Sequence, residues 1–277
     1  MHISFSKGEI RYKAEGQGPA IVFLHGHMES AKIWKKYANE LSKRFRTIRI
    51  DLPGHGKSSV FDEVHSMEFM ADAVRAVFEA EKIDKALLIG HSMGGYVALA
   101  FAETHPDKVR GLVLFSSISF ADTKERQNER ERAIKAAEAH KMKYITSVIP
   151  NLFFERSGAK ASKRIFKLVK IAAKQPKEGI TAAIRGMRDR ADRTKILKNA
   201  KFPVLFIAGQ DDFLIPLERI EEMHRQVPNA KLVVIEQCGH AGFIEQEKEC
   251  FTQHEWRGCR PLENSEGYSA ARLKTST

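Results

Sequence analysis

Residues 90–94 read Gly90-His91-Ser92-Met93-Gly94, and their neighbours make this short run informative. The apolar run Ala86–Ile89 lies directly before it, and a helix-like stretch, Tyr96–Phe101, follows. A serine in a tight turn between a buried strand and a helix needs glycine two positions away on either side, because the two backbones pass too closely for a Cβ atom. The run therefore predicts a turn that holds the Ser92 hydroxyl above a sheet edge, facing the free N–H groups of the helix.

Short apolar runs alternate with segments of helical period, which is typical of a mostly parallel α/β sheet with helices on both faces. The expected strands are Ala20–Leu24, Phe45–Ile50, Ala86–Ile89, Val109–Phe115, Val204–Ala208 and Leu232–Ile235. The expected helices between them are Ser30–Lys43, Met67–Ala80, Tyr96–Thr104 and Leu217–Gln226. The first dozen residues are expected to form an antiparallel hairpin at the sheet edge, with its turn near Lys7-Gly8.

The alternation stops between about Ser119 and Lys201, where only the helical period remains. Apolar residues recur there at i, i+3, i+4 and i+7, starting from Ile165 and again from Ile180. We therefore expect an inserted helical cap over residues 119–201 and an α/β core made of residues 1–118 and 202–251. Residues 252–277 show neither period and are polar, so we expect this tail to be poorly ordered.

The formal net charge of +11 is concentrated in one segment. Residues 121–200 hold 21 Lys and Arg against 9 Asp and Glu, which leaves the rest of the chain at −1. This basic cap could be an electropositive lid that attracts anionic substrates, such as carboxylates or phosphate-bearing acyl carriers. It could also be the solvated outer face of amphipathic helices, which is the interpretation we favour. Nucleic-acid binding is not expected, because no aromatic or groove-reading element accompanies the charge.

The N-terminus lacks the apolar region of a signal peptide, and no apolar run approaches the roughly 18 residues that span a bilayer. Three cysteines, Cys238, Cys250 and Cys259, are odd in number and lack metal-ligand spacing. They are expected to be reduced thiols, so we expect a cytoplasmic protein without membrane association. The sequence does not indicate an oligomeric state.

A serine hydroxyl is a poor nucleophile unless a base lies beside it and a third group orients that base. On a sheet of this kind the partners follow in the order serine, acid, histidine, each after a strand. The loop after Val204–Ala208 contains Asp211 and Asp212, and Gly239-His240 follows the strand Leu232–Ile235. Position alone leaves either aspartate open as the acid.

These features together resemble the α/β-hydrolase-fold serine hydrolases, in particular small bacterial esterases and enol-lactonases. The resemblance covers roughly residues 10–250. Its motifs are His25-Gly26, the run Asp51–Ser58 (DLPGHGKS), the GHSMGG run that contains Ser92, Gly209-x-x-Asp212-x-x-x-Pro216 and Gly239-His240.

The resemblance implies a role for each matched residue. Ser92 would be the nucleophile, His240 the general base and then acid, and Asp212 the residue that orients His240. Asp211 and, less so, Asp122 in the loop after the Val109–Phe115 strand remain alternatives to Asp212. The backbone N–H groups of His27 and Met93 would form the oxyanion hole. No cofactor or metal is required.

Several motifs have other interpretations that the sequence argues against. The run Gly54–Ser58 resembles half a phosphate-binding loop, but the glycine expected at position 51 is Asp51. His25-x-His27 suggests a metal pair, yet the next expected ligand positions hold Glu29 and Ser30. His25 is expected to brace the oxyanion loop, His91 to be an ordinary neighbour of the serine, and Cys238 to be a small buried packing residue.

The predicted activity is hydrolysis of a carboxylic ester, thioester or lactone through an acyl-enzyme on Ser92. The substrate would be a small acyl compound, with an anionic one left open. Met28, Phe153, Phe154 and Phe213 are expected to line a partly apolar acyl pocket. The same triad also supports cofactor-free perhydrolase (haloperoxidase-like) chemistry or carbon–carbon bond hydrolysis. A non-enzymatic ligand receptor on this fold is a further alternative, because fold alone does not prove function.

Overall fold

The structure is a computed structural model that describes residues 1–154, 158–227 and 230–252. Its strands are β1 (His2–Phe5), β2 (Gly8–Glu15), β3 (Ala20–Leu24), β4 (Arg46–Ile50), β5 (Ala86–His91), β6 (Val109–Phe115), β7 (Val204–Gly209) and β8 (Lys231–Ile235). Its α-helices are α1 (Lys35–Leu41), α2 (Met67–Ala80), α3 (Met93–Thr104), α4 (Lys124–Ala139), α5 (Lys141–Val148), α6 (Gly158–Ala172), α7 (Lys177–Arg188), α8 (Thr194–Lys198), α9 (Leu217–Arg225), α10 (Gly242–Glu245) and α11 (Glu247–Thr252). Short 3₁₀ helices are η1 (Ala31–Trp34), η2 (Pro106–Lys108) and η3 (Ile149–Leu152).

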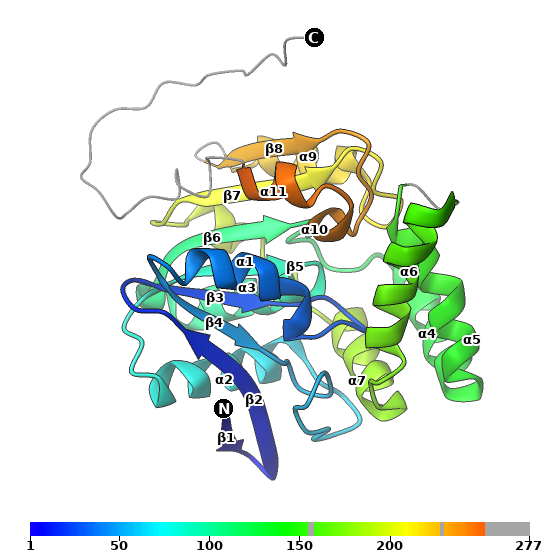
Figure 1. Cartoon of the computed structure of the whole chain (residues 1–277), viewed down its shortest axis with the longest axis horizontal. Coiled ribbons are helices and arrows are strands. Elements are labelled where there is room, and N and C mark those ends of the chain that lie inside the picture. The colour runs from blue at the N-terminus through cyan, green and yellow to red at the C-terminus, as the bar shows by residue number, and fades with distance from the viewer. Residues whose placement is uncertain (155–157, 228–229, 253–277) are drawn as a thin grey trace.

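One sheet contains all these strands in the order β1-β2-β4-β3-β5-β6-β7-β8. The first two strands form an antiparallel hairpin, β2 pairs antiparallel with β4, and every later pair is parallel. In Figure 1, α1 and α11 lie on the near face of the sheet and α2, α3 and α9 on the far face. The α/β fold and the expected strands are therefore confirmed, with strand ends shifted by only one or two residues. The expected helix at Ser30–Lys43 is divided into η1 and α1.

The strand order creates a switch point beside β3. The chain leaves β3 for β4 on one side and then returns to β5 on the other side. The connections after β3 and β5 therefore leave the sheet in opposite directions, and a crevice opens between them at the carboxyl ends of the strands. The residues that follow β3 and β5 are His25–Ser30 and Ser92, so the fold itself brings these two segments together.

The chain between β6 and β7 forms the helices α4 to α8 and η3. Helices α4 to α7 gather beyond the ends to which the arrows of β6 and β8 point (Figure 1). The expected tail falls almost wholly on residues 253–277, which lie outside the described residues. Within the described chain, no helix combines the length and apolar character needed to cross a bilayer.

The turn between β5 and α3 is as tight as the glycine pattern predicts. Ser92 has φ 50° and ψ −116°, a conformation that residues with a side chain rarely adopt. A Cβ atom on Gly90 would lie 2.4 Å from the backbone oxygen of Gly94, and one on Gly94 would lie 2.4 Å from the backbone oxygen of Leu24 at the end of β3. The turn therefore packs directly against the loop that follows β3.

This contact gives a stability prediction. Gly94→Ala should lower the free energy of unfolding by about 1–3 kcal/mol or more, because overpacking a rigid backbone contact costs at least that much. Gly111→Ala in β6 is the matched control, because its new Cβ would meet a Leu87 side-chain methyl at 3.1 Å, which can move. Urea denaturation of both variants measures the difference. An equal decrease in the free energy of unfolding for Gly94→Ala and Gly111→Ala would contradict the close approach of α3 to β3.

Candidate active site

His240 and Asp212 meet at the ends of neighbouring strands. Asp212 follows β7, and His240 follows β8. Asp212 Oδ2 accepts a hydrogen bond of 2.7 Å from His240 Nδ1, and both side chains are buried. Asp212 Oδ1 accepts hydrogen bonds from the backbone N–H groups of Leu214 and Ile215, at 2.9 and 3.0 Å. These three bonds hold the carboxylate in one orientation against the imidazole.

The structure separates the three candidate acids. Asp212 binds His240, whereas the backbone N–H of Asp211 donates to the Cys238 carbonyl, and no hydrogen bond or ion pair joins the Asp211 carboxylate to the imidazole. Asp122 accepts hydrogen bonds from Arg130 and Arg190 instead. Of these carboxylates only Asp212 is placed to orient His240.

Burial alone would raise the pKa of Asp212, because it disfavours the charged form. The charge and hydrogen bond of His240, with the two backbone N–H groups, outweigh this effect and leave the Asp212 pKa below its usual value. The Asp212 carboxylate is therefore ionised at neutral pH, so it can stabilise a positive charge on His240.

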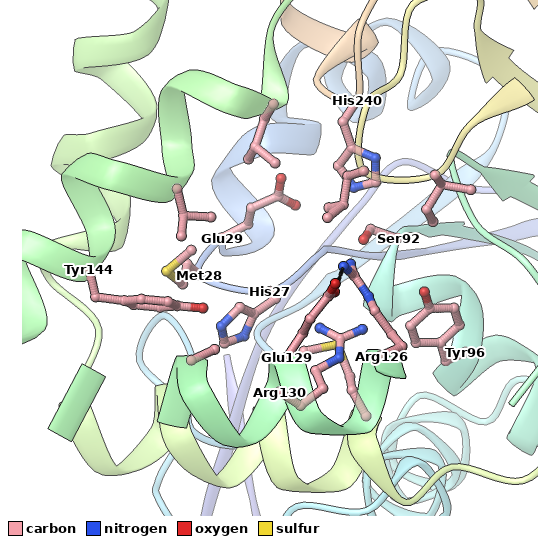
Figure 2. Close-up of a pocket in the computed structure, with 16 residues that line it drawn as sticks. His27, Met28, Glu29, Ser92, Tyr96, Arg126, Glu129, Arg130, Tyr144 and His240 are labelled. Atoms are coloured by element: carbon pink, nitrogen blue, oxygen red, sulfur yellow. Dashed lines mark hydrogen bonds and ion pairs between the residues drawn. The ribbon is translucent and has the colours of Figure 1, made fainter. Parts of the chain in front are cut away.

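Ser92 and His240 line the same cavity, which also contacts His27 and Met28. Figure 2 shows the His240 imidazole next to the Ser92 side chain at one end of this cavity. The Ser92 backbone is fixed on both sides: its N–H donates to Phe115, and its carbonyl accepts from the Ser117 hydroxyl at 2.8 Å. The fold thus brings together the three side chains that the sequence singled out.

His27 lines this cavity, and Met93 directly follows Ser92 in the chain. Met93 is the first residue of α3, where N–H groups have no partner within the helix. In the described part of the chain neither N–H donates to another residue. The loop that carries His27 is braced by His25, which accepts from the Leu52 N–H at 3.0 Å, and by His55, which accepts from Met28 at 3.3 Å.

A buried ion pair that the sequence did not indicate joins His91 to Glu29, which lines the cavity. His91 Nδ1 is 3.0 Å from Glu29 Oε2, and His91 Nε2 is 3.0 Å from the backbone oxygen of His240. The same Glu29 oxygen accepts from the Gly26 N–H at 2.6 Å. Because a carboxylate and a carbonyl can only accept, both His91 nitrogens carry protons. This imidazolium connects the loop after β3 to the loop that holds His240.

His91 is therefore more than an ordinary neighbour of Ser92. Burial works against charge on both partners, but their attraction and hydrogen bond are stronger. The pKa of His91 is accordingly above its ordinary 6.5, and that of Glu29 is below its ordinary 4.5. The available signal was a glutamate in the short loop after the buried strand β3, where an unpaired carboxylate would be costly.

The cavity measures about 190 Å³. Its apolar lining is made of Met28, Ala133, Val148, Leu152, Met187, Leu214 and Ile215. The expected pocket residues need correction apart from Met28. Phe153 is buried in the core away from the cavity, and Phe154 and Phe213 are 42% and 65% exposed on the surface. Side-chain direction decides this, and no spacing in the sequence reports it for loop residues.

The Cys238 thiol and the candidate metal ligands show no sign of a catalytic or metal-binding role in the described residues. Burial is the main cause that raises the pKa of the Cys238 thiol, which suits a packing residue. Within residues 1–154, 158–227 and 230–252, no group of three or more His, Cys, Asp or Glu side chains is placed to hold a metal ion.

Comparison with known proteins agrees with the fold. A family model for the α/β hydrolase fold matches residues 19–247. The chain is 30% identical to a pimeloyl-[acyl-carrier protein] methyl ester esterase of Aliivibrio salmonicida over 87% of this chain and 93% of that protein. A thermophilic esterase from Thermogutta terrifontis, with malate bound, superimposes with a TM-score of 0.86 at 32% identity over 91% of this chain and 94% of that one. An enol-lactonase from Burkholderia xenovorans shares the fold, with a TM-score of 0.81 at 23% identity over 91% and 96% of the two chains. The chain belongs to the α/β hydrolase fold family.

The Glu29–His91 pair predicts a pH-dependent contribution to stability. Because the folded pKa of His91 is raised, its contribution is complete below about pH 6.5 and is lost as the pH rises through the folded pKa. Because the folded pKa of Glu29 is lowered, its contribution is complete above about pH 4.5 and is lost as the pH falls. The pair should therefore stabilise the protein most between about pH 4.5 and 6.5.

Urea denaturation at pH 4, 5.5 and 8.5 tests this window with Glu29→Gln. The free energy of unfolding of the variant should fall furthest below that of wild type at pH 5.5, because breaking a buried pair typically costs about 3–5 kcal/mol. Glu40→Gln is the control, because Glu40 forms an exposed pair with Lys43 that is worth about 1 kcal/mol or less. A loss for Glu29→Gln that stays the same at all three pH values would rule out the charged pair.

Proposed function

We propose that this protein is a serine hydrolase that cleaves a small carboxylic ester through an acyl-enzyme on Ser92. The observation that carries the proposal is the buried 2.7 Å hydrogen bond from His240 Nδ1 to Asp212, next to Ser92 on its strained turn. A nucleophile, a base and a group that orients the base are the three parts that this chemistry requires. The esterase names of two relatives at 30% identity or more support an ester as the substrate.

In the acylation step, His240 Nε2 removes the Ser92 proton while Ser92 Oγ attacks the ester carbonyl carbon. The negative charge that develops on the carbonyl oxygen is stabilised by the His27 and Met93 N–H groups, which have no internal acceptor to give up. The ionised Asp212 stabilises the imidazolium. His240 then protonates the leaving alcohol, and water activated by the same histidine releases the acid.

The size of the cavity favours a short substrate. Its volume of about 190 Å³ is below the roughly 300–1,000 Å³ that is usual for pockets that hold drug-sized ligands. The apolar side chains of Met28, Leu214 and Ile215 lie in its wall with Ser92. We therefore expect a low KM and a high kcat for esters with short acyl chains. As the acyl chain lengthens, KM should rise and kcat should fall.

Replacement of the proposed triad tests the function. Hydrolysis of p-nitrophenyl acetate should fall by about 10⁴–10⁶-fold in kcat for Ser92→Ala and His240→Ala, and by about 10⁴-fold for Asp212→Asn. Asp211→Asn is the matched control, since it removes the neighbouring carboxylate, which forms no hydrogen bond or ion pair with His240. Its rate should change by less than about threefold.

Two results would contradict the proposal. Equal losses for Asp211→Asn and Asp212→Asn would remove the role of the observed hydrogen bond. Turnover of acetate with peroxide, or of a diketone, that exceeds turnover of every ester in kcat/KM would favour perhydrolase or carbon–carbon bond chemistry. Both reactions use the same side chains, so product analysis and not mutation separates them.

A further inference from the structure

The cavity has a second polar region, formed by residues of α4 and α5 and by the His27 side chain. Arg126, Glu129 and Arg130 of α4 and Tyr144 of α5 contribute to its lining. Figure 2 shows Arg126 and Arg130 reaching from α4 towards the interior, with Tyr144 and His27 together on one side. The proposed esterase chemistry uses none of these side chains, apart from the His27 backbone.

Arg130 is held so that its terminal nitrogens are available. Its Nε donates to Asp122 Oδ2 at 3.0 Å, and Asp122 Oδ1 accepts from Arg190 Nη1 at 2.6 Å. The side chains of Asp122 and Arg190 are 3% exposed, so this support is rigid and dry. In the part of the chain that the structure describes, the two Nη atoms of Arg130 donate to no other residue.

The charges around Arg130 leave a positive excess. Asp122 is shared by two guanidinium groups, Arg130 and Arg190. The nearby Arg126 is neutralised by Glu129, whose Oε2 lies 2.6 Å from Arg126 Nη1. One further negative charge at the Arg130 fork would therefore complete the local balance, and a planar carboxylate matches the two parallel N–H directions of that fork.

His27 adds an independent observation. Both of its ring nitrogens are buried and have no hydrogen-bond partner among the described residues. Burial is the main cause that lowers the pKa of His27 to about 3, with the charge of Arg130 adding to it, so the ring is neutral and carries one N–H. Buried polar atoms without a partner are uncommon in folded proteins and indicate a missing one. The Tyr144 hydroxyl points towards this ring (Figure 2).

We propose that Arg130, with His27 and Tyr144 beside it, binds a carboxylate carried by the substrate while the ester carbonyl lies at Ser92. This inference rests on the proposed esterase function and specifies its substrate class. Because about 190 Å³ holds both groups, the substrate is a short ester with one free carboxylate. The carboxylate belongs either to the acyl part, as in a monoester of a short dicarboxylic acid, or to the alcohol part, as in an acylated hydroxy acid.

Two matched pairs of esters test the proposal and distinguish these sources. Monomethyl succinate against dimethyl succinate tests the acyl side, and O-acetylglycolate against its methyl ester tests the alcohol side. The wild-type enzyme should prefer the charged member of one pair in kcat/KM. Arg130→Gln should lower that charged-to-neutral ratio by about 10- to 100-fold, which is the usual effect of losing a charge-assisted hydrogen bond.

Two further variants control for charge and for folding. Arg132→Gln removes an exposed arginine from the same helix and should leave the ratio unchanged. Arg130→Lys keeps the charge but not the fork, so its ratio should lie between those of wild type and Arg130→Gln. Arg130→Gln leaves Asp122 paired with Arg190, and its melting temperature verifies folding. If it does not fold, Arg130→Lys and the wild-type ratios decide the question.

Calorimetric binding of monomethyl succinate and O-acetylglycolate to Ser92→Ala protein separates the two proposals, because binding requires no turnover. Binding that weakens with Arg130→Gln supports the carboxylate site even if no ester is hydrolysed, in which case the esterase function fails alone. Ester hydrolysis with charged-to-neutral ratios that are the same in wild type, Arg130→Gln and Arg132→Gln would overturn the carboxylate site and leave the esterase function standing.

Discussion

The hydrogen bond between Asp212 and His240 joins two loops that the chain separates by 28 residues. It forms because β7 and β8 are parallel neighbours, so that the segments after them leave the same edge of the sheet. Asp212 is held from its other side by backbone N–H groups of its own loop, which keeps the carboxylate ionised although it is buried. Without this bond the imidazole would have no fixed tautomer, and the strained turn at Ser92 would place a hydroxyl beside a ring of undefined orientation.

Buried polar groups beside the site are bonded to one another and to the backbone. Glu29 and His91 are both almost wholly buried, yet each charge has a partner; Glu29 Oε2 also accepts from the Gly26 N–H, and His91 Nε2 bonds to the His240 carbonyl. Burying such a pair costs free energy of desolvation, and breaking it leaves a buried charge without a partner. Its structural role is to connect the loop after β3 to the loop of His240. The cavity side differs, because the Arg130 fork and the His27 ring have unfilled hydrogen-bonding capacity. These unfilled hydrogen-bonding groups indicate that a ligand binds on the cavity side.

The fold and the three central side chains could be predicted because each depends on a local pattern. Ser92 lies between two glycines that the close approach of α3 demands, and Asp212 and His240 each follow an apolar strand. The pairing of Glu29 with His91 spans 62 positions and depends on which strands are neighbours, so no spacing in the sequence reports it. The same limit explains why Phe213, next to Asp212 in the chain, points to solvent while Met187 of α7 lines the cavity. Composition likewise could not separate the arginines of the basic segment, where Arg190 is buried in a salt bridge and Arg130 faces the cavity.

The most direct measurement is rapid acid quenching of the enzyme during turnover of a p-nitrophenyl ester, followed by peptide mass spectrometry. The account predicts a peptide containing Ser92 that carries the mass of the acyl group, together with a burst of p-nitrophenol equal to the enzyme concentration if deacylation is the slower step. The adduct should be absent from Ser92→Ala protein and greatly reduced in His240→Ala protein. Steady ester hydrolysis with the acyl group on a different residue, or with the same adduct formed in denatured protein, would contradict the central claim.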